Sequence, residues 1–104
     1  MQIIPLNNIP NQVFSIVLND VDYRIAVRTI QGFTLISVWQ NGDLLFYNQL
    51  CAPNGFVNPY DYVSKNGKLY FKCLDNEYPN YTQFGSTQQL YFLTPDEVKL
   101  YEEA

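Results

Sequence analysis

The stretch YRIAVRTIQGFTLISVWQNGDLLFY, residues 23–47, decides the fold class of this chain. Its first part alternates, with Tyr23, Ile25 and Val27 on one face and Arg or Ala between them, as a half-buried strand does. A run of β-branched and aromatic residues follows, and an Asn-Gly pair at 41–42 then signals a tight hairpin. We therefore predict a meander of three antiparallel strands over residues 23–28, 33–39 and 44–47.

Strand patterns also flank this stretch on both sides. Val13–Leu18 precedes it, Lys68–Leu74 follows an irregular segment rich in turn residues, and Gln89–Leu93 is the last strand pattern. Only the C-terminal end is helical in character, because Thr94 is a good N-cap for a helix over Pro95–Glu103. The pattern indicates an all-β fold: a compact antiparallel β-sandwich or barrel of six to seven strands with a short C-terminal helix.

The composition is that of a folded domain with little surface charge. Of the 104 residues, 47% are hydrophobic and 16% aromatic, while only 15% are charged, against about 25% in an average domain. No stretch is polar or repetitive enough to be a linker, so we predict a single β domain over residues 1–104. With so few charged residues, part of the surface is expected to be apolar or rich in tyrosine and to bind a partner.

The charge pattern argues against nucleic-acid and membrane partners. The net charge is −4 and the six Lys and Arg residues are scattered, whereas nucleic-acid binding usually needs a basic stripe. The apolar residues 1–18 lack a basic flank and are interrupted by Pro5 and Pro10, so we expect neither a secretory signal nor a membrane anchor. In a chain kept in a cytoplasm, Cys51 and Cys73 are expected to be buried thiols rather than a disulfide.

Side chains suited to enzyme chemistry are scarce. The chain contains no histidine, which removes the Ser-His-Asp and Cys-His arrangements and most zinc ligand sets. Asp20 and Asp22 could form an acid/base pair, but they are also ordinary turn residues. Asp75, Glu77 and Asn80 could line a cation, but they lack the glycine pattern of a calcium loop. We therefore predict no enzymatic activity, no catalytic or metal site, and no cofactor.

The segment 77–86 is the strongest candidate for an interface. It combines three aromatic rings with a proline and a glycine, and tyrosine provides a large contact area at a low entropy cost. The same rings could instead pack as a cap over one end of a barrel, and both alternatives fit the sequence equally well. The candidate contact residues are Tyr78, Pro79, Tyr81, Phe84 and Gly85.

Two further groups are weaker candidates. Arg24 and Arg28 lie on the polar face of their predicted strand and could meet acidic patches on a neighbouring protein, although most exposed arginines are merely solvated. Trp39, Tyr60 and Tyr62 could stack on a sugar ring or another planar ligand. That alternative would make the chain a small ligand- or carbohydrate-binding β module, although aromatic residues at strand spacing are more often core.

Several short segments together match the pattern of a known family. They are MQIIPL (1–6), PNQVF (10–14), YRIAVR (23–28), the segment with Trp39, YPNY (78–81), and FGS (84–86) leading to Leu90-Tyr91. With them the chain resembles the small baseplate plug proteins of contractile-tailed bacteriophages, which also have about one hundred residues. The resemblance covers most of the chain, and the tail from Thr94 to Ala104 departs from the pattern.

The resemblance implies a structural virion protein without catalysis. It implies a place near the tail axis, within the trimeric hub that joins the tail tube, the tape-measure protein and the spike. The expected partners are therefore the phage tail hub, spike and tape-measure proteins, with a homo-oligomer in the particle as a further option. The expected location is the tail baseplate of the virion, after assembly in the host cytoplasm.

Overall fold

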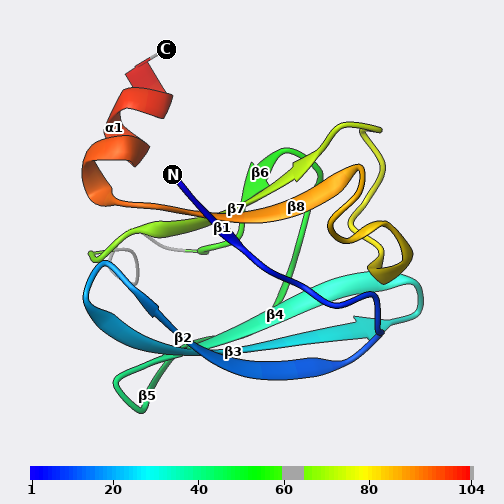
Figure 1. The fold of residues 1–104 in the computed structure, drawn as a ribbon, viewed down its shortest axis with the longest axis horizontal. Coiled ribbons are helices and arrows are strands. Elements are labelled where there is room, and N and C mark those ends of the chain that lie inside the picture. The colour runs from blue at the N-terminus through cyan, green and yellow to red at the C-terminus, as the bar shows by residue number, and fades with distance from the viewer. Residues whose placement is uncertain (60–64, 104) are drawn as a thin grey trace.

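A computed structural model describes residues 1–59 and 65–103, and these residues form two antiparallel sheets packed face to face (Figure 1). The strands are β1 (Gln2–Ile4), β2 (Gln12–Leu18), β3 (Val21–Ile30), β4 (Phe33–Gln40), β5 (Asp43–Leu50), β6 (Gly55–Phe56), β7 (Lys68–Cys73) and β8 (Gln88–Leu93). One sheet has the order β2-β3-β4-β5 and the other the order β1-β8-β7-β6. The prediction of an all-β sandwich with a short C-terminal helix is confirmed.

The β2-β3-β4-β5 sheet is a meander held by three two-residue turns. Each turn has positive φ at both central residues, between 51° and 86°, as the hairpin turns that match strand twist require. Asn, Asp and Gly tolerate that backbone conformation best. The turns are Asn19-Asp20, Gln31-Gly32 and Asn41-Gly42.

The core lies between the two sheets. Ile25 and Val27 of β3 and Ile36 of β4 are fully buried against side chains of the other sheet, among them Phe71 of β7 and Leu90 of β8. Both sheets therefore bury one face in a shared apolar layer, which is the arrangement of a β-sandwich.

Two of the observed strands, β1 and β6, are not among those that the sequence predicts. β1 has three residues and pairs with β8, and β6 has two residues and pairs with β7. Their short length gives no readable alternation, and both are strands only because a distant part of the chain lies beside them. The long loop after β7 also holds a short 3-10 helix, Tyr81–Gln83, whose N-cap is Asn80.

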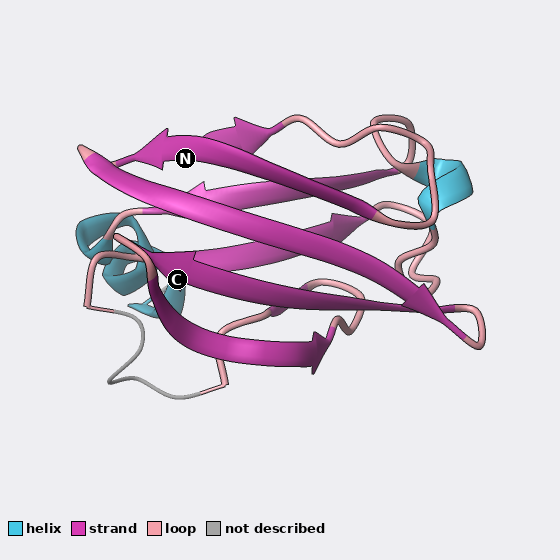
Figure 2. Cartoon of the chain, turned by 90° about the horizontal axis from the view of Figure 1, so that it is seen from below, coloured by secondary structure: helices cyan, strands magenta, loops and turns pink. Residues whose placement is uncertain are grey.

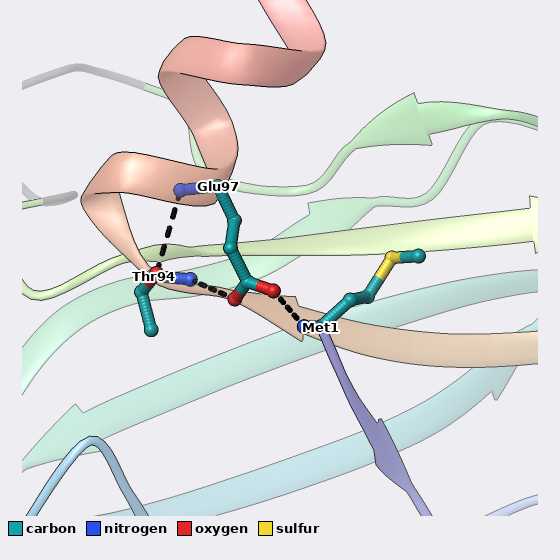
Figure 3. A network of polar contacts seen from close by, with 3 residues as sticks. All are labelled: Met1, Thr94 and Glu97. Atoms are coloured by element: carbon teal, nitrogen blue, oxygen red, sulfur yellow. Dashed lines mark hydrogen bonds and ion pairs between the residues drawn. The ribbon is translucent and has the colours of Figure 1, made fainter.

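The helix α1 (Pro95–Glu103) begins after Thr94, the N-cap that the sequence predicts, and Glu97 completes a capping box with it. The backbone N–H of Thr94 donates to Glu97 Oε1 at 3.0 Å, and the N–H of Glu97 donates back to Thr94 Oγ1 at 3.4 Å (Figure 3). The Met1 ammonium group forms an ion pair with the other carboxylate oxygen of Glu97. No helix in the described part of the chain is long and apolar enough to span a membrane.

Helix α1 packs on the outer face of the β1-β8-β7-β6 sheet. Val98 contacts Tyr70 and Leu93, and all three side chains are buried. The Tyr70 and Tyr101 hydroxyl groups are 2.8 Å apart, and both rings make edge or tilted contacts with Phe56 or each other. One outer face of the sandwich is thus partly covered by a helix.

Candidate functional site

The outer face of the meander sheet has no such cover. Ile25 and Val27 face the core, so strand alternation turns Arg24 and Arg28 outward. Figure 2, seen from below, looks onto this face, and no described helix crosses it. We call this surface over β3, β4 and β5, with the loop residue at its end, the meander face; its residues are Arg24, Arg28, Ile30, Phe33, Trp39, Leu44, Tyr47, Leu50 and Tyr78.

The meander face is unusually apolar for an uncovered sheet surface. Its large hydrophobic side chains Ile30, Phe33, Leu44, Tyr47, Leu50 and Tyr78 are each between 41% and 61% exposed. Val13 and Val17 continue the apolar surface onto β2 and are also more than half exposed. Single exposed apolar side chains are ordinary, whereas a contiguous group of them marks an interaction surface.

A β-bulge in β5 places two of these side chains on the same face. Phe46 points into the core, so strict alternation would also turn Leu50 inward. Asn48, at φ 48°, is the extra residue that shifts the phase. Its N–H donates to Ser37 Oγ at 2.8 Å, which fixes the bulge. Tyr47 and Leu50 therefore both lie on the meander face.

Aromatic rings position the two cations of the meander face. The Arg24 guanidinium lies 5.3 Å from the centroid of the Trp39 ring, close enough for a cation–π contact. Arg28 Nη1 donates to Tyr47 Oη at 3.5 Å. Within the described residues neither guanidinium forms an ion pair. Both cations are thus held over an apolar surface with donors left for a carboxylate.

The loop between β7 and β8 brings Tyr78 to the end of the meander face. The Tyr78 ring meets the Phe33 ring edge-on at a centroid distance of 5.5 Å. The loop backbone is fixed by Gln88, whose Nε2 donates to the Tyr78 carbonyl at 3.2 Å and whose Oε1 accepts from Asn80 N–H at 2.7 Å. Thr34 Oγ1 also donates to the Pro79 carbonyl at 2.8 Å. Tyr78 therefore stands on a rigid base.

The other loop candidates lie elsewhere. The side chains of Pro79 and Phe84 are buried, and the Phe84 ring packs against Phe71. Tyr81 is half-buried against the same core. Gly85 is exposed with φ 81° and lines a cavity of about 280 Å³ beside β1. The loop thus combines the two alternatives, because part of it caps the core and Tyr78 alone joins Arg24 and Arg28 on one surface.

The sugar-binding group is not brought together by the described residues. Trp39 lies on the meander face, with Arg24 over its ring. Tyr60 and Tyr62 lie outside the described residues. Of the three proposed sugar-binding rings, the described structure therefore contains Trp39 alone, and Arg24 already contacts the face of this ring.

Of the acidic candidates, Asp20 and Asp75 serve a turn and the loop, whereas Asp22 lies in β3 opposite Val17 of β2. Asp20 is a turn residue at φ 62°. Asp75 accepts hydrogen bonds from the Glu77 N–H at 3.0 Å and Thr87 Oγ1 at 2.9 Å, and these bonds hold the pKa of its carboxyl below the usual value. Asn80 Oδ1 caps the short helix. The described residues contain no group of three or more His, Cys, Asp or Glu placed to hold a metal ion.

Both cysteines are free and buried. Burial raises the pKa of the Cys51 and Cys73 thiols. A thiol with a raised pKa stays protonated at neutral pH and is a poor nucleophile. The two side chains therefore serve as small apolar core residues.

Sequence reasoning missed much of the meander face. Leu44, Tyr47 and Leu50 gave no signal, because β5 has two register shifts against β4, one between Leu44 and Phe46 and one at Asn48, and neither can be read from alternation. Gln88 also gave none, although its buried amide organises the loop that carries Tyr78. The available clue was the low charge of the chain, which indicated a reserved surface without locating it.

Comparison with known proteins gives one result for nearly the whole chain. The family model described as cyanophage baseplate Pam3 plug gp18 matches residues 1–96. No curated protein matches the chain. The matched region contains both sheets and the complete meander face, and it ends in the first turn of α1.

Proposed function

This chain belongs to the cyanophage baseplate plug family, and on that premise we propose that it is a structural part of a phage tail baseplate, without enzymatic activity, that binds neighbouring baseplate proteins through its meander face. The proposed partners are the tail hub, spike and tape-measure proteins, met during assembly in the host cytoplasm. The observation that carries the proposal is the contiguous apolar and aromatic surface, left uncovered on one side of the sandwich.

The residue types of the meander face support this role. Protein interfaces are enriched in aromatic residues and arginine at their centre, where a few such side chains provide most of the binding energy. Tyr47 and Trp39 are large, rigid anchors, and the bound positions of Arg24 and Arg28 are partly set in advance by their ring contacts. Less ordering is then needed on binding, which favours affinity.

The partner surface should be apolar with carboxylates among its side chains. Arg24 and Arg28 both leave guanidinium donors unused within the described residues, and a carboxylate can accept two of them at once. Charge pairs of this kind mainly set orientation and the association rate. The apolar residues around them would then provide most of the buried area.

Co-expression of the chain with its hub, spike and tape-measure proteins, followed by affinity capture and a measured Kd, tests the proposal. We expect the double variant R24E/R28E to weaken binding at least tenfold. The matched control is K72E/K99E, which reverses two exposed cations on the opposite sheet and on α1 and changes the net charge equally. The control should bind like the wild type.

A second variant separates the apolar contribution from the charge contribution. Tyr47→Ala removes an exposed ring without changing the charge, and we expect another loss of about tenfold in affinity, as for an interface anchor. Circular dichroism must show that each variant is folded. The proposal is overturned if none of the three proteins binds the chain, or if the meander-face variants and the control bind alike.

A further inference from the structure

The edge strand β2 lacks every feature that normally protects a sheet edge. Natural edges are shortened, bulged, charged or interrupted by proline, because an unpaired strand is a template for another chain. β2 has the sequence QVFSIVL, which contains neither charge nor proline. Its register with β3 is continuous from Gln12 to Leu18.

The other sheet edges among the described strands are protected. β1 has three residues and β6 has two, so neither offers much backbone to a partner. β5 begins at Asp43 and is interrupted by the bulge at Asn48. The contrast singles out β2 as the edge that can accept a further strand.

The side chains of β2 are incompletely covered on both faces. Phe14 and Ile16 pack against the core but stay partly exposed, because the edge strand of the opposite sheet, β1, is less than half as long as β2. Val13 and Val17 point to the other face and are more than half exposed. Another strand beside β2 would cover all four side chains.

The sequence of β2 is complementary to itself. If two β2 strands run antiparallel about a two-fold axis at Ser15, Val13 of one copy lies opposite Val17 of the second, and Phe14 lies opposite Ile16. Cross-strand pairs of β-branched and aromatic residues stabilise a sheet, and no like charges meet. The strand is therefore suited to pairing with an identical strand.

We propose that two copies of this chain pair through β2, antiparallel and centred on Ser15, so that their meander sheets form one continuous sheet. The pairing closes both exposed edges, and the bulged β5 strands become the outer borders. A two-fold interface of this kind is the commonest closed symmetry of protein assemblies. The two meander faces then lie on the same side of the joined sheet. The pairing through β2 does not require a partner protein to be bound at the meander face.

The test uses charges at positions 13 and 17, which the pairing places opposite each other. In V13K/V17K, lysines face lysines across the interface, and the dimer should dissociate with a Kd at least tenfold higher. In V13E/V17K, each glutamate faces a lysine of the second copy, so self-association should be retained. Sedimentation velocity over a range of concentrations gives the masses, relative to a chain mass of 12.1 kDa.

A wild-type protein that stays monomeric over the whole range would overturn the proposal, and so would equal behaviour of the two double variants. If V13K/V17K does not fold, wild-type amide exchange decides the question. Exchange from β2 should slow as concentration rises, and an unchanged rate would contradict the pairing. R24E/R28E should keep the wild-type mass, so loss of partner binding through the meander face is distinguishable from loss of this dimer.

Discussion

The backbone conformation of the loop before β8 depends on the side-chain amide of Gln88. This amide is fully buried and bonds the backbone on both sides of Pro79, at the Tyr78 carbonyl and the Asn80 N–H. Leaving a backbone group inside the protein without its partner costs more than an average hydrogen bond contributes. The position of Tyr78 on the meander face therefore rests on a residue that is not itself at the surface.

We expect Gln88→Leu to lower the free energy of unfolding by about 2–3 kcal/mol, because it leaves two partly buried backbone groups without their partner. Chemical denaturation measures the change. The control is Gln89→Leu, whose side chain is half-exposed and whose loss should cost no more than about 0.5 kcal/mol. Equal stability of the two variants would show that the loop has other supports.

Gly67 meets a steric limit that the turn glycines do not. It has φ 142°, and a Cβ there would overlap the Leu93 carbonyl oxygen and the Phe92 ring. Gly42 also has positive φ, at 86°, but a Cβ there would meet open space. A substitution at Gly42 therefore tests backbone strain alone, whereas one at Gly67 tests strain together with steric overlap.

We expect Gly42→Ala to cost about 1 kcal/mol through strain alone, and Gly67→Ala to cost about 3 kcal/mol or more, because overpacking adds to strain. Thermal and chemical denaturation of both variants give the difference. Similar costs at the two sites would mean that Phe92 moves aside freely and that the approach at Gly67 is not limiting.

At the scale of elements, local signals predicted the hairpins and the helix. Two-residue turns with Asn or Gly and the Thr94 capping box depend on neighbours within a few residues, so the sequence contains the information. β1 and β6 could not be predicted, because they exist by pairing with β8 and β7. The bulge at Asn48 was also missed, since its phase shift shows only once β5 pairs with β4.

Helix α1 changes the titration of the tyrosine it covers. Burial, followed by the hydrogen bond with Tyr101, raises the pKa of Tyr70 from 10.0 to about 12. Because the folded value lies above the unfolded one, this stabilisation is complete below pH 10 and is lost as the pH rises to about 12. Denaturation at several pH values should show stability falling across that interval.

Tyr101→Phe tests the cause of this shift. It removes the hydroxyl partner and keeps the ring, so the pKa of Tyr70 should fall towards its ordinary value while α1 stays docked through Val98. An NMR titration of the tyrosine Cζ resonances measures both proteins. An unchanged Tyr70 titration in the variant would mean that burial alone sets the pKa.

At the scale of the whole molecule, the sequence predicted the class of the fold and the family, and the family model confirms the latter over residues 1–96. It could not locate the meander face, because that face is assembled from three strands and a loop that contact one another only after folding. Of the predicted contact residues, Arg24, Arg28 and Tyr78 meet there. Pro79 and Phe84 are in the interior, since their loop folds back onto the core.

The single β domain over residues 1–104 stays a prediction, and the shared core makes it testable. Trp39 is the only tryptophan of the chain and lies in the meander sheet, whereas Phe71 is fully buried in the opposite sheet. Leu74, just past the same strand, is 70% exposed and provides the control site. If one core holds both sheets, a cavity made in one sheet must destabilise the other.

Phe71→Ala should lower the free energy of unfolding by about 3–5 kcal/mol, and Trp39 fluorescence should report the same transition as amide exchange from β7 and β8. Leu74→Ala should change the free energy of unfolding by no more than about 0.5 kcal/mol. Both probes must coincide in the wild type as well, because a two-state domain unfolds as a unit. If exchange from β7 and β8 rises in Phe71→Ala while the Trp39 transition stays in place, the two sheets are separate cooperative units.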